Sequence, residues 1–310
     1  MDRLEAMALL VATVECGSMS AAGRKLAVPV ATLSRKLSEL EAHLGVRLLT
    51  RSTRRLELTE AGAAYLAASR RILEEVAEAE REATGEYLQP RGELVLTSPL
   101  SFGRLHVLPI VNAFLSENPE ISVRLGLSDQ QMDLMGEHID LAFRIGNLAD
   151  SQLVGRRIGD IRWVVVGAPD FLAAHGTPSV PAEAAALPCV GVDYMHLASS
   201  WRFRDLETGA EHLQPVRPRL AVSTAHAAID AAAAGMGLTQ TVLYEAAPAI
   251  AAGKLKIVLP AYEARPLPLS IVYPGRGRMP LKTRSFLDFA APTLAAEMQR
   301  LDAIARGASL

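Results

Sequence analysis

One amphipathic segment, PVATLSRKLSELEAHLG at residues 29–45, constrains the fold of this chain more than any other feature. Its apolar residues recur every three or four positions, at Val30, Leu33, Leu37, Leu40 and Leu44. That spacing predicts an α-helix with one face against a core. The other face carries small and basic residues first and acidic ones later, the reverse of what the helix dipole favours. A partner outside the helix is therefore expected against its first half.

Short helices and a basic hairpin surround this segment. A first helix is predicted over residues 4–15; Gly17 ends it, and Ser18 or Ser20 can cap a short second helix. The residues after the third helix, VRLLTRSTRRLELT, place apolar side chains on either side of a basic tip, which predicts a two-stranded hairpin. Two short helices joined by a tight turn form a helix-turn-helix, and the basic hairpin after them is a wing.

Positive charge is concentrated in this module. The 310 residues carry a formal net charge of −2, so the protein is not basic overall. Between Arg24 and Arg55, however, eight basic residues stand against only two acidic ones, Glu39 and Glu41. A local basic patch on a helix-turn-helix is typical of a modular nucleic-acid binder.

A long helix and a larger second domain follow the wing. Thr59 is expected to cap a helix that reaches about Glu86, and its alanine-rich apolar stripe predicts pairing with a second copy of the same helix. Pro90 and Gly92 break the pattern, so the domain boundary is placed there. Beyond it strands and helices alternate, which predicts a mostly parallel α/β sheet, and about 220 residues suffice for two lobes.

Residues 16–62, CGSMSAAGRKLAVPVATLSRKLSELEAHLGVRLLTRSTRRLELTEAG, resemble the winged helix-turn-helix of the LysR-type transcriptional regulators. They depart from it mildly at Val30 and Leu49, where many members have Pro and Phe. The remainder is similar to the effector domain of that family, in particular to a branch with DLAFRIG, at residues 140–146, followed by DSQLVGRRIG. The resemblance covers nearly the whole chain.

The resemblance implies an α/β architecture in three parts: a winged helix-turn-helix over 1–58, a linker and dimerisation helix over 59–89, and an effector-binding domain over 90–310. The last part would have two periplasmic-binding-protein-like lobes, lobe I at about 90–161 and 268–300 and lobe II at about 162–267. The protein would then be a cytoplasmic homodimer or homotetramer that does not bind membranes. Its partners would be double-stranded operator DNA and a small effector between the lobes, for which an anion is one possibility that the helix N-termini below suggest.

Small side chains would let the predicted recognition helix enter the major groove, and the forked guanidinium of Arg35 can read guanine. Lys36, Ser20 and the wing arginines are expected on phosphate or, for the wing, in the minor groove. Each charge alone is more often a solvated surface residue, but the set clusters on a motif that needs it. The DNA-binding candidates are Ser20, Val30, Ala31, Thr32, Ser34, Arg35, Lys36, Arg51, Arg54 and Arg55.

Small polar residues at three predicted strand-to-helix junctions are the main candidates for the effector site. Helix N-termini suit anions, although Ser and Thr at such places commonly serve only as caps. Arg144 could meet an anion or pair with Asp140, and Trp201 and Phe203 could cover the site or lie in a core. The effector-binding candidates are Thr97, Ser98, Pro99, Ser101, Ser128, Arg144, Trp201, Phe203, Ser223 and Thr224.

The sequence offers no constellation for catalysis, a metal ion or a cofactor. No H-E-x-x-H, G-x-S-x-G or phosphate-loop motif appears, and the seven histidines are scattered. Two lone cysteines, Cys16 and Cys189, favour a reducing compartment, and neither a signal peptide nor a membrane span is expected. An enzyme with an accessory DNA-binding head and an architectural DNA-binding protein are the alternative hypotheses.

Overall fold

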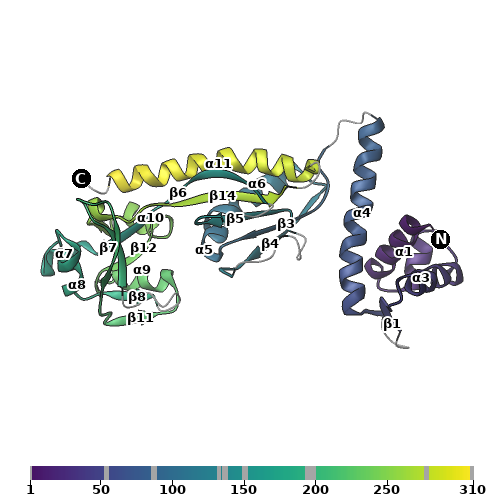
Figure 1. Ribbon diagram of the computed structural model, residues 1–310, viewed down its shortest axis with the longest axis horizontal. Coiled ribbons are helices and arrows are strands. Elements are labelled where there is room, and N and C mark those ends of the chain that lie inside the picture. The colour runs from purple at the N-terminus through teal and green to yellow at the C-terminus, as the bar shows by residue number, and fades with distance from the viewer. Residues whose placement is uncertain are drawn as a thin grey trace. The chain divides into compact units, whose positions relative to one another are not determined.

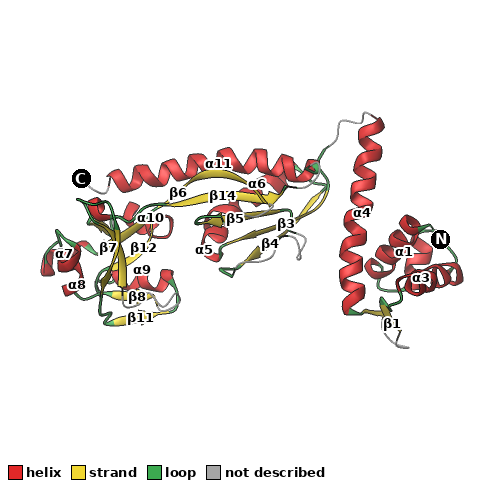
Figure 2. Ribbon diagram, in the orientation of Figure 1, coloured by secondary structure: helices red, strands yellow, loops and turns green. Residues whose placement is uncertain are grey.

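The computed structural model describes residues 2–51, 56–84, 89–130, 134, 139–148, 153–192, 200–275 and 279–307. The chain divides into two units, Met1–Gly92 and Glu93–Leu310 (Figures 1 and 2). Each unit encloses an apolar core of its own.

The first unit is a helix-turn-helix followed by a two-stranded hairpin and a long helix. Its core gathers the apolar stripe of the third helix, where Leu33, Leu37 and Leu40 are at most 2% exposed. The left-handed Gly45, at φ 70°, ends that helix as the sequence predicts. The elements are α1 (Arg3–Glu15), α2 (Met19–Lys25), α3 (Val30–Leu44), β1 (Leu49–Arg51), β2 (Leu56–Leu58) and α4 (Glu60–Thr84).

The hairpin is held to both α3 and α4. Glu41 of α3 accepts backbone N–H bonds from Leu48 at 2.8 Å and Leu49 at 3.0 Å. Gly62 of α4 lies so close to the same segment that a Cβ there would be 1.9 Å from the carbonyl oxygen of Leu48. The Thr59 hydroxyl accepts the Gly62 N–H at 2.9 Å, which is the cap expected for α4. The Glu41 carboxylate, the hydrogen bonds from Thr59 to Arg47 and Leu48, and the absence of a side chain at Gly62 therefore hold the wing against the two helices.

Lobe I of the second unit is built on a five-stranded sheet in the order β4-β3-β5-β14-β6. Strands β3 and β5 are parallel, but β14 is antiparallel to β5 and β6 because it carries the chain back from the other lobe. Strands β3, β5 and β6 therefore share one direction, and β14 is the strand that interrupts the expected parallel order. The elements are β3 (Gly92–Ser98), α5 (Leu100–Phe102), the π-helical turn η1 (Gly103–Val107), α6 (Leu108–Glu117), β4 (Ile121–Leu127), β5 (Leu141–Ile145), β6 (Leu153–Ile161) and β14 (Leu267–Pro274).

Lobe II, residues 162–266, contains three smaller sheets. Strand β7 pairs antiparallel with β12 and β13, and β9 and β10 form a hairpin. Strands β8 and β11 pair in parallel, and an isolated parallel bridge joins Cys189 to Leu238. The parallel expectation is thus wrong for most of the strand pairs described in this lobe. Its elements are β7 (Trp163–Gly167), α7 (Pro169–His175), α8 (Pro181–Ala186), β8 (Val190–Val192), β9 (Ser200–Arg204), β10 (Glu211–Pro215), β11 (Leu220–Val222), α9 (Ala225–Ala233), β12 (Thr239–Val242), α10 (Leu243–Ala251), β13 (Lys256–Val258) and the 3₁₀ turn η3 (Pro260–Tyr262).

The last helix, α11 (Leu281–Gly307), packs against β6 and α6 of lobe I and against α10 of lobe II (Figure 1). The sequence also predicts a short helix over residues 129–138, but most of these residues lie outside the described part of the chain. Among the described helices none alone is long and apolar enough to span a membrane; α1 and α2 pass such a test only as a pair, bent by 117°.

Candidate DNA-reading head and interlobe site

The recognition helix α3 separates a core face from an open face. Val30 is 43% exposed, Ala31 and Arg35 are exposed, and Thr32 and Ser34 are half-buried, while the leucine stripe between them is enclosed. The first half of α3 therefore exposes small and basic side chains, while the leucines that pack the core are buried on the opposite face. This is the surface that a major groove can accept.

Two basic side chains of α3 have acidic partners within the head. Arg35 donates from Nη1 to Glu39, one turn further along the same helix, and its side chain stays 62% exposed. Since a guanidinium has five N–H donors, the pair leaves Arg35 other donors for a base. Lys36, in contrast, pairs with Glu5 of α1 and is 23% exposed, so its ammonium is directed along the head rather than outward.

The remaining DNA-binding candidates differ in what the structure says of them. Ser20 is exposed as the second residue of α2, but the cap of that helix is Ser18, whose hydroxyl accepts the Ala21 N–H at 3.1 Å. Arg51 lies in β1, where the structure describes its backbone but not its side chain. Arg54 and Arg55 lie outside the described residues.

The junction after β3 contains four of the effector candidates. Thr97 and Ser98 are enclosed, at 1% and 0% exposure, which removes them from direct contact with a ligand in this conformation. Pro99 precedes α5, and Ser101 within α5 is half-buried. Ser128 is also half-buried and ties its segment to β3, donating its backbone N–H to the Ser98 carbonyl at 3.0 Å.

Ser101 belongs to a polar cluster that joins the two lobes. Its hydroxyl hydrogen-bonds to Glu245 at the start of α10. Arg104 of η1 donates from Nη2 to His226 Nε2 in α9, and His226 Nδ1 lies 3.7 Å from Glu245 Oε2. Because an arginine can only donate, His226 Nε2 must accept, which leaves Nδ1–H pointing at the carboxylate. We call these four residues the interlobe cluster: Ser101 and Arg104 of lobe I and His226 and Glu245 of lobe II. In it, the lobe I side chains donate to His226 and Glu245 across the boundary between the lobes.

Glu245 is the buried member of the interlobe cluster. It is 8% exposed, and within the described residues its Oε2 has no hydrogen-bond partner. Burial raises the pKa of its carboxyl, while His226 opposes that shift. Asp129, which accepts the Leu100 N–H at 3.0 Å, raises the pKa of Glu245 further through like charge. A buried carboxylate with an unused oxygen is a group that a donor on a bound molecule could satisfy.

Tyr244 joins the cluster to the interior. Burial raises the pKa of its phenol, and the neighbouring Glu245 adds to the shift. Its ring packs edge-on against Phe102 at 5.4 Å and His106 at 5.6 Å, both from lobe I. The tyrosine therefore lies where the lobes meet.

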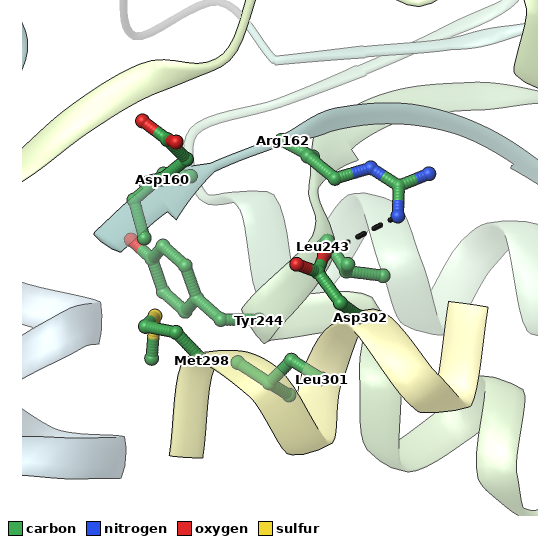
Figure 3. A pocket seen from close by; sticks show the side chains of 8 residues that line it. Asp160, Arg162, Leu243, Tyr244, Met298, Leu301 and Asp302 are labelled. Carbon is green, nitrogen blue, oxygen red and sulfur yellow. Dashed lines mark hydrogen bonds and ion pairs between the residues drawn. The ribbon is translucent and has the colours of Figure 1, made fainter. Parts of the chain in front are cut away.

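Two segments of the chain, called crossovers here, connect the lobes: one between β6 and β7, the other just before β14. A small pocket lies behind Tyr244, between the first crossover and α11 (Figure 3). The space within it is about 10 Å³, which is at the lower limit for one water molecule. It is too small for an effector. Its lining is formed by Asp160, Ile161, Arg162, Leu243, Tyr244, Met298, Leu301 and Asp302.

Trp201 and Phe203 do not line a site. They are 4% and 1% exposed and pack in a second core within lobe II, together with Val165 and Phe171. On β9 they alternate with the exposed Arg202 and Arg204, so the strand turns its aromatic face inward. The expectation that they cover an effector is wrong, and the core alternative holds.

Of the remaining candidates, Thr224 has a structural role as a helix cap. Thr224 is exposed and caps α9, its hydroxyl accepting the Ala227 N–H at 3.2 Å, and the exposed Ser223 precedes it. Arg144 is half-buried in β5 opposite Ser270, and burial lowers the pKa of its guanidinium. Asp140 accepts the Val95 N–H at 2.8 Å and lies 3.9 Å from Lys282 Nζ.

Sequence reasoning missed Arg104, His226, Tyr244 and Glu245. One signal was present, because Glu245 is the only charged residue in the otherwise apolar helix LYEAAPAIA. A lone carboxylate on an apolar helix indicates a buried polar contact. The other three side chains carried no comparable signal.

Known proteins share both parts of this arrangement. Residues 4–63 match the model for "Bacterial regulatory helix-turn-helix protein, lysR family", and residues 88–295 match the model for "LysR substrate binding domain". An HTH-type transcriptional regulator of Xanthomonas campestris pv. campestris (strain 8004) is 35% identical over 288 residues, which is 92% of this chain and 84% of that protein. The regulator CrgA of Neisseria meningitidis serogroup B (strain MC58) is 33% identical over 94% of this chain and 96% of its own.

Solved structures agree with these matches. The structure of CrgA, described as a LysR-type transcriptional regulator from Neisseria meningitidis, superposes with a TM-score of 0.58 at 32% identity, over 95% of this chain and 98% of that one. The full-length virulence activator AphB of Vibrio cholerae superposes with a TM-score of 0.57 at 29% identity, over 93% and 98% of the two chains. The winged head, the linker helix and the two-lobed α/β domain are thus matched together, and the chain belongs to the LysR-type transcriptional regulators, a non-enzymatic family of DNA-binding proteins with an effector-binding domain.

Proposed function

We propose that the first half of α3 reads the operator in the major groove, with Arg35 at a guanine. The observation that carries the proposal is the division of α3 into an enclosed leucine stripe and an open face of small and basic side chains. Val30, Ala31, Thr32 and Ser34 are the neighbours proposed to approach base edges. Ser20, Arg51, Arg54 and Arg55 are proposed on phosphate or in the minor groove, and Lys36 only once it leaves Glu5.

The regulator is proposed to act in the cytoplasm as a homodimer or homotetramer. Leu66 and Ser69 of α4 are buried in the core of the head, whereas Ala68, Ile72 and Val76 form a half-buried apolar stripe. A stripe of this spacing on an otherwise charged helix supports pairing with a second copy. Two copies would present two heads to a two-fold-symmetric operator.

A small effector is proposed at the interlobe cluster, with lobe I at about 90–161 and 268–300 and lobe II at about 162–267. The support is that side chains of both lobes converge at Glu245, which keeps an oxygen unpaired among the described residues. We propose that the effector is anionic where it faces Arg104, the exposed cation of the cluster. Residues 140–146, which include β5, are proposed to place the chain in the DLAFRIG branch of the family.

The test is selection of genomic fragments by the purified protein at fixed, near-physiological salt. A shared two-fold-symmetric site is expected, because base contacts specify a sequence while phosphate contacts do not. Arg35→Ala should relax the preference at one base pair of each half-site, at a cost of about 1–3 kcal/mol. Arg54→Ala should weaken binding evenly across sequences and reduce its salt dependence.

Retention without a common site, lost as salt rises, would contradict the proposal and indicate electrostatic binding alone. If both variants lost only nonspecific affinity, the assignment of α3 as the reading helix would be wrong. If a shared site is found, the pathway of the neighbouring genes nominates effectors to test. A melting temperature of the protein that no metabolite shifts would favour an architectural DNA-binding protein.

A further inference from the structure

Helix α11 is fastened to both lobes. Its 27 residues span about 40 Å at 1.5 Å per residue. In its first half Phe286 packs edge-on against Phe114 of lobe I at 5.1 Å. In its second half Met298, Leu301 and Ala305 are at most 6% exposed and belong to the core that includes α10 of lobe II. Figure 1 shows the helix extending from one lobe to the other.

One apolar core therefore extends across both lobes of the second unit, beside the separate core of lobe II that holds Trp201 and Phe203. It joins the lobe I sheet, through Leu141 and Ile271, with Val164 and Ile250 of lobe II, and the buried face of α11 completes it. Two-lobed proteins that close on a ligand bend at their crossovers, with separate cores on either side. In this protein, the same bending would have to separate one half of α11 from the apolar residues that it packs against.

An arginine ties the helix to both crossovers. Arg162 follows the last residue of β6. Its Nε and Nη2 donate hydrogen bonds of 2.8 Å to the two carboxylate oxygens of Glu263, which lies just before β14. Its Nη1 also reaches Asp302 of α11 at 3.3 Å (Figure 3). The side chains of Arg162 and Glu263 are 23% and 14% exposed, so this pair is shielded from water and stronger than a pair on an open surface, whereas Asp302 is 43% exposed.

We propose that the second half of α11 is a brace that holds the two lobes in one relative position, with Arg162 and Asp302 as positioning residues. The natural place for the brace to yield is Pro292, which cannot donate the helix bond at that point. Tyr244 connects the brace to the interlobe cluster, since it lines the pocket with Met298 and Leu301 and precedes Glu245. This inference rests on the proposed function in one respect: the lobe movement that the brace restrains is the one an effector between the lobes would cause.

The test measures the distance between the lobes in the full-length protein without any ligand. Spin labels are placed at Ala113→Cys on α6 and Ala174→Cys on α7, two exposed helical positions, in a Cys16→Ser background. Excess unlabelled protein removes distances between copies. The wild-type brace should give one narrow distance distribution by pulsed electron paramagnetic resonance.

The brace variant is Leu301→Ala with Asp302→Asn, and it should add a second, displaced population. The matched control is Asp288→Asn, which removes a pair between the first half of α11 and Arg156 of the same lobe, at 3.5 Å, and should leave one population. A broad wild-type distribution, or a folded brace variant identical to wild type, would overturn the proposal. If the double variant does not fold by circular dichroism, Asp302→Asn alone decides in the same way.

The outcome is independent of the proposed function. If operator selection fails, the proposal that α3 reads DNA is wrong, but the distance distributions between the lobes are unaffected. Failure of the brace would leave operator selection unchanged, because the head and the labelled unit are separate parts of the chain.

Discussion

Replacing Gly62 by alanine should destabilise the DNA-reading head, although helix propensity alone predicts the opposite. Alanine in a helix interior is favoured over glycine by about 1 kcal/mol. At Gly62, however, the new Cβ would lie 1.9 Å from the carbonyl oxygen and 2.8 Å from the carbonyl carbon of Leu48. These are backbone atoms that cannot rotate away, so α4 and the wing must move apart by more than an ångström.

The magnitude follows from two opposing terms. Overpacking costs about 1–3 kcal/mol, and a clash with backbone belongs at the upper end, about 3 kcal/mol. Subtracting the propensity gain of about 1 kcal/mol leaves a net loss of about 2 kcal/mol. Since 1.4 kcal/mol is a factor of ten, opening of the head should become about 30-fold more frequent.

Hydrogen exchange followed by mass spectrometry can report this within the intact protein. Peptides from α1 and α3 should exchange about 30-fold faster in Gly62→Ala, while peptides from lobe I remain unchanged. The neighbouring exposed position gives the control, because Ala63→Gly loses only propensity, about 1 kcal/mol, and creates no clash. Exchange in Gly62→Ala that is slower than in wild type would refute the steric reasoning.

Three further outcomes are expected. Glu41→Gln keeps a hydrogen-bond acceptor but loses the negative charge, which should weaken the bonds from Leu48 and Leu49 by about 1 kcal/mol. The amide hydrogens of these two residues should then exchange several-fold faster, and unchanged exchange would show that Glu41 does not hold the wing. Burial lowers the pKa of His106 below its ordinary 6.5, so the unfolded state binds more protons below that pH and stability should fall on acidification; in urea melts His106→Gln should lose this slope, and an equal slope would contradict it. Cys189 is fully enclosed and burial raises the pKa of its thiol, so a thiol reagent should modify it only after denaturant is added, and rapid native modification would be inconsistent with its burial.

Local chemistry made much of the head predictable. A cap such as Thr59 and a helix end such as Gly45 depend on residues within a few positions, so the sequence carries their signals directly. The interlobe cluster depends on distant residues, because Arg104 and His226 are 122 positions apart and meet only after both lobes have formed. No periodicity within either segment reports that meeting.

The lobes show a second limit of pattern reading. Alternation on β9 identifies a strand with one buried face, but it does not say whether that face meets a core or a ligand, and Trp201 and Phe203 meet a core. Likewise the alternation of strands and helices indicates an α/β domain without giving strand direction. The reversed β14 follows from a crossover that returns the chain, a feature of topology rather than of local sequence.

The division of labour on α3 has an evolutionary consequence. Val30, Ala31 and Thr32 contribute little to the enclosed stripe, so under the proposed reading of DNA by α3, substitutions there would change which base pairs are preferred without unfolding the head. The same freedom is available to engineering, where a new target sequence could be selected from a library confined to that face. Lineages that duplicate such a gene can therefore acquire new promoters before their sensory domains have changed at all.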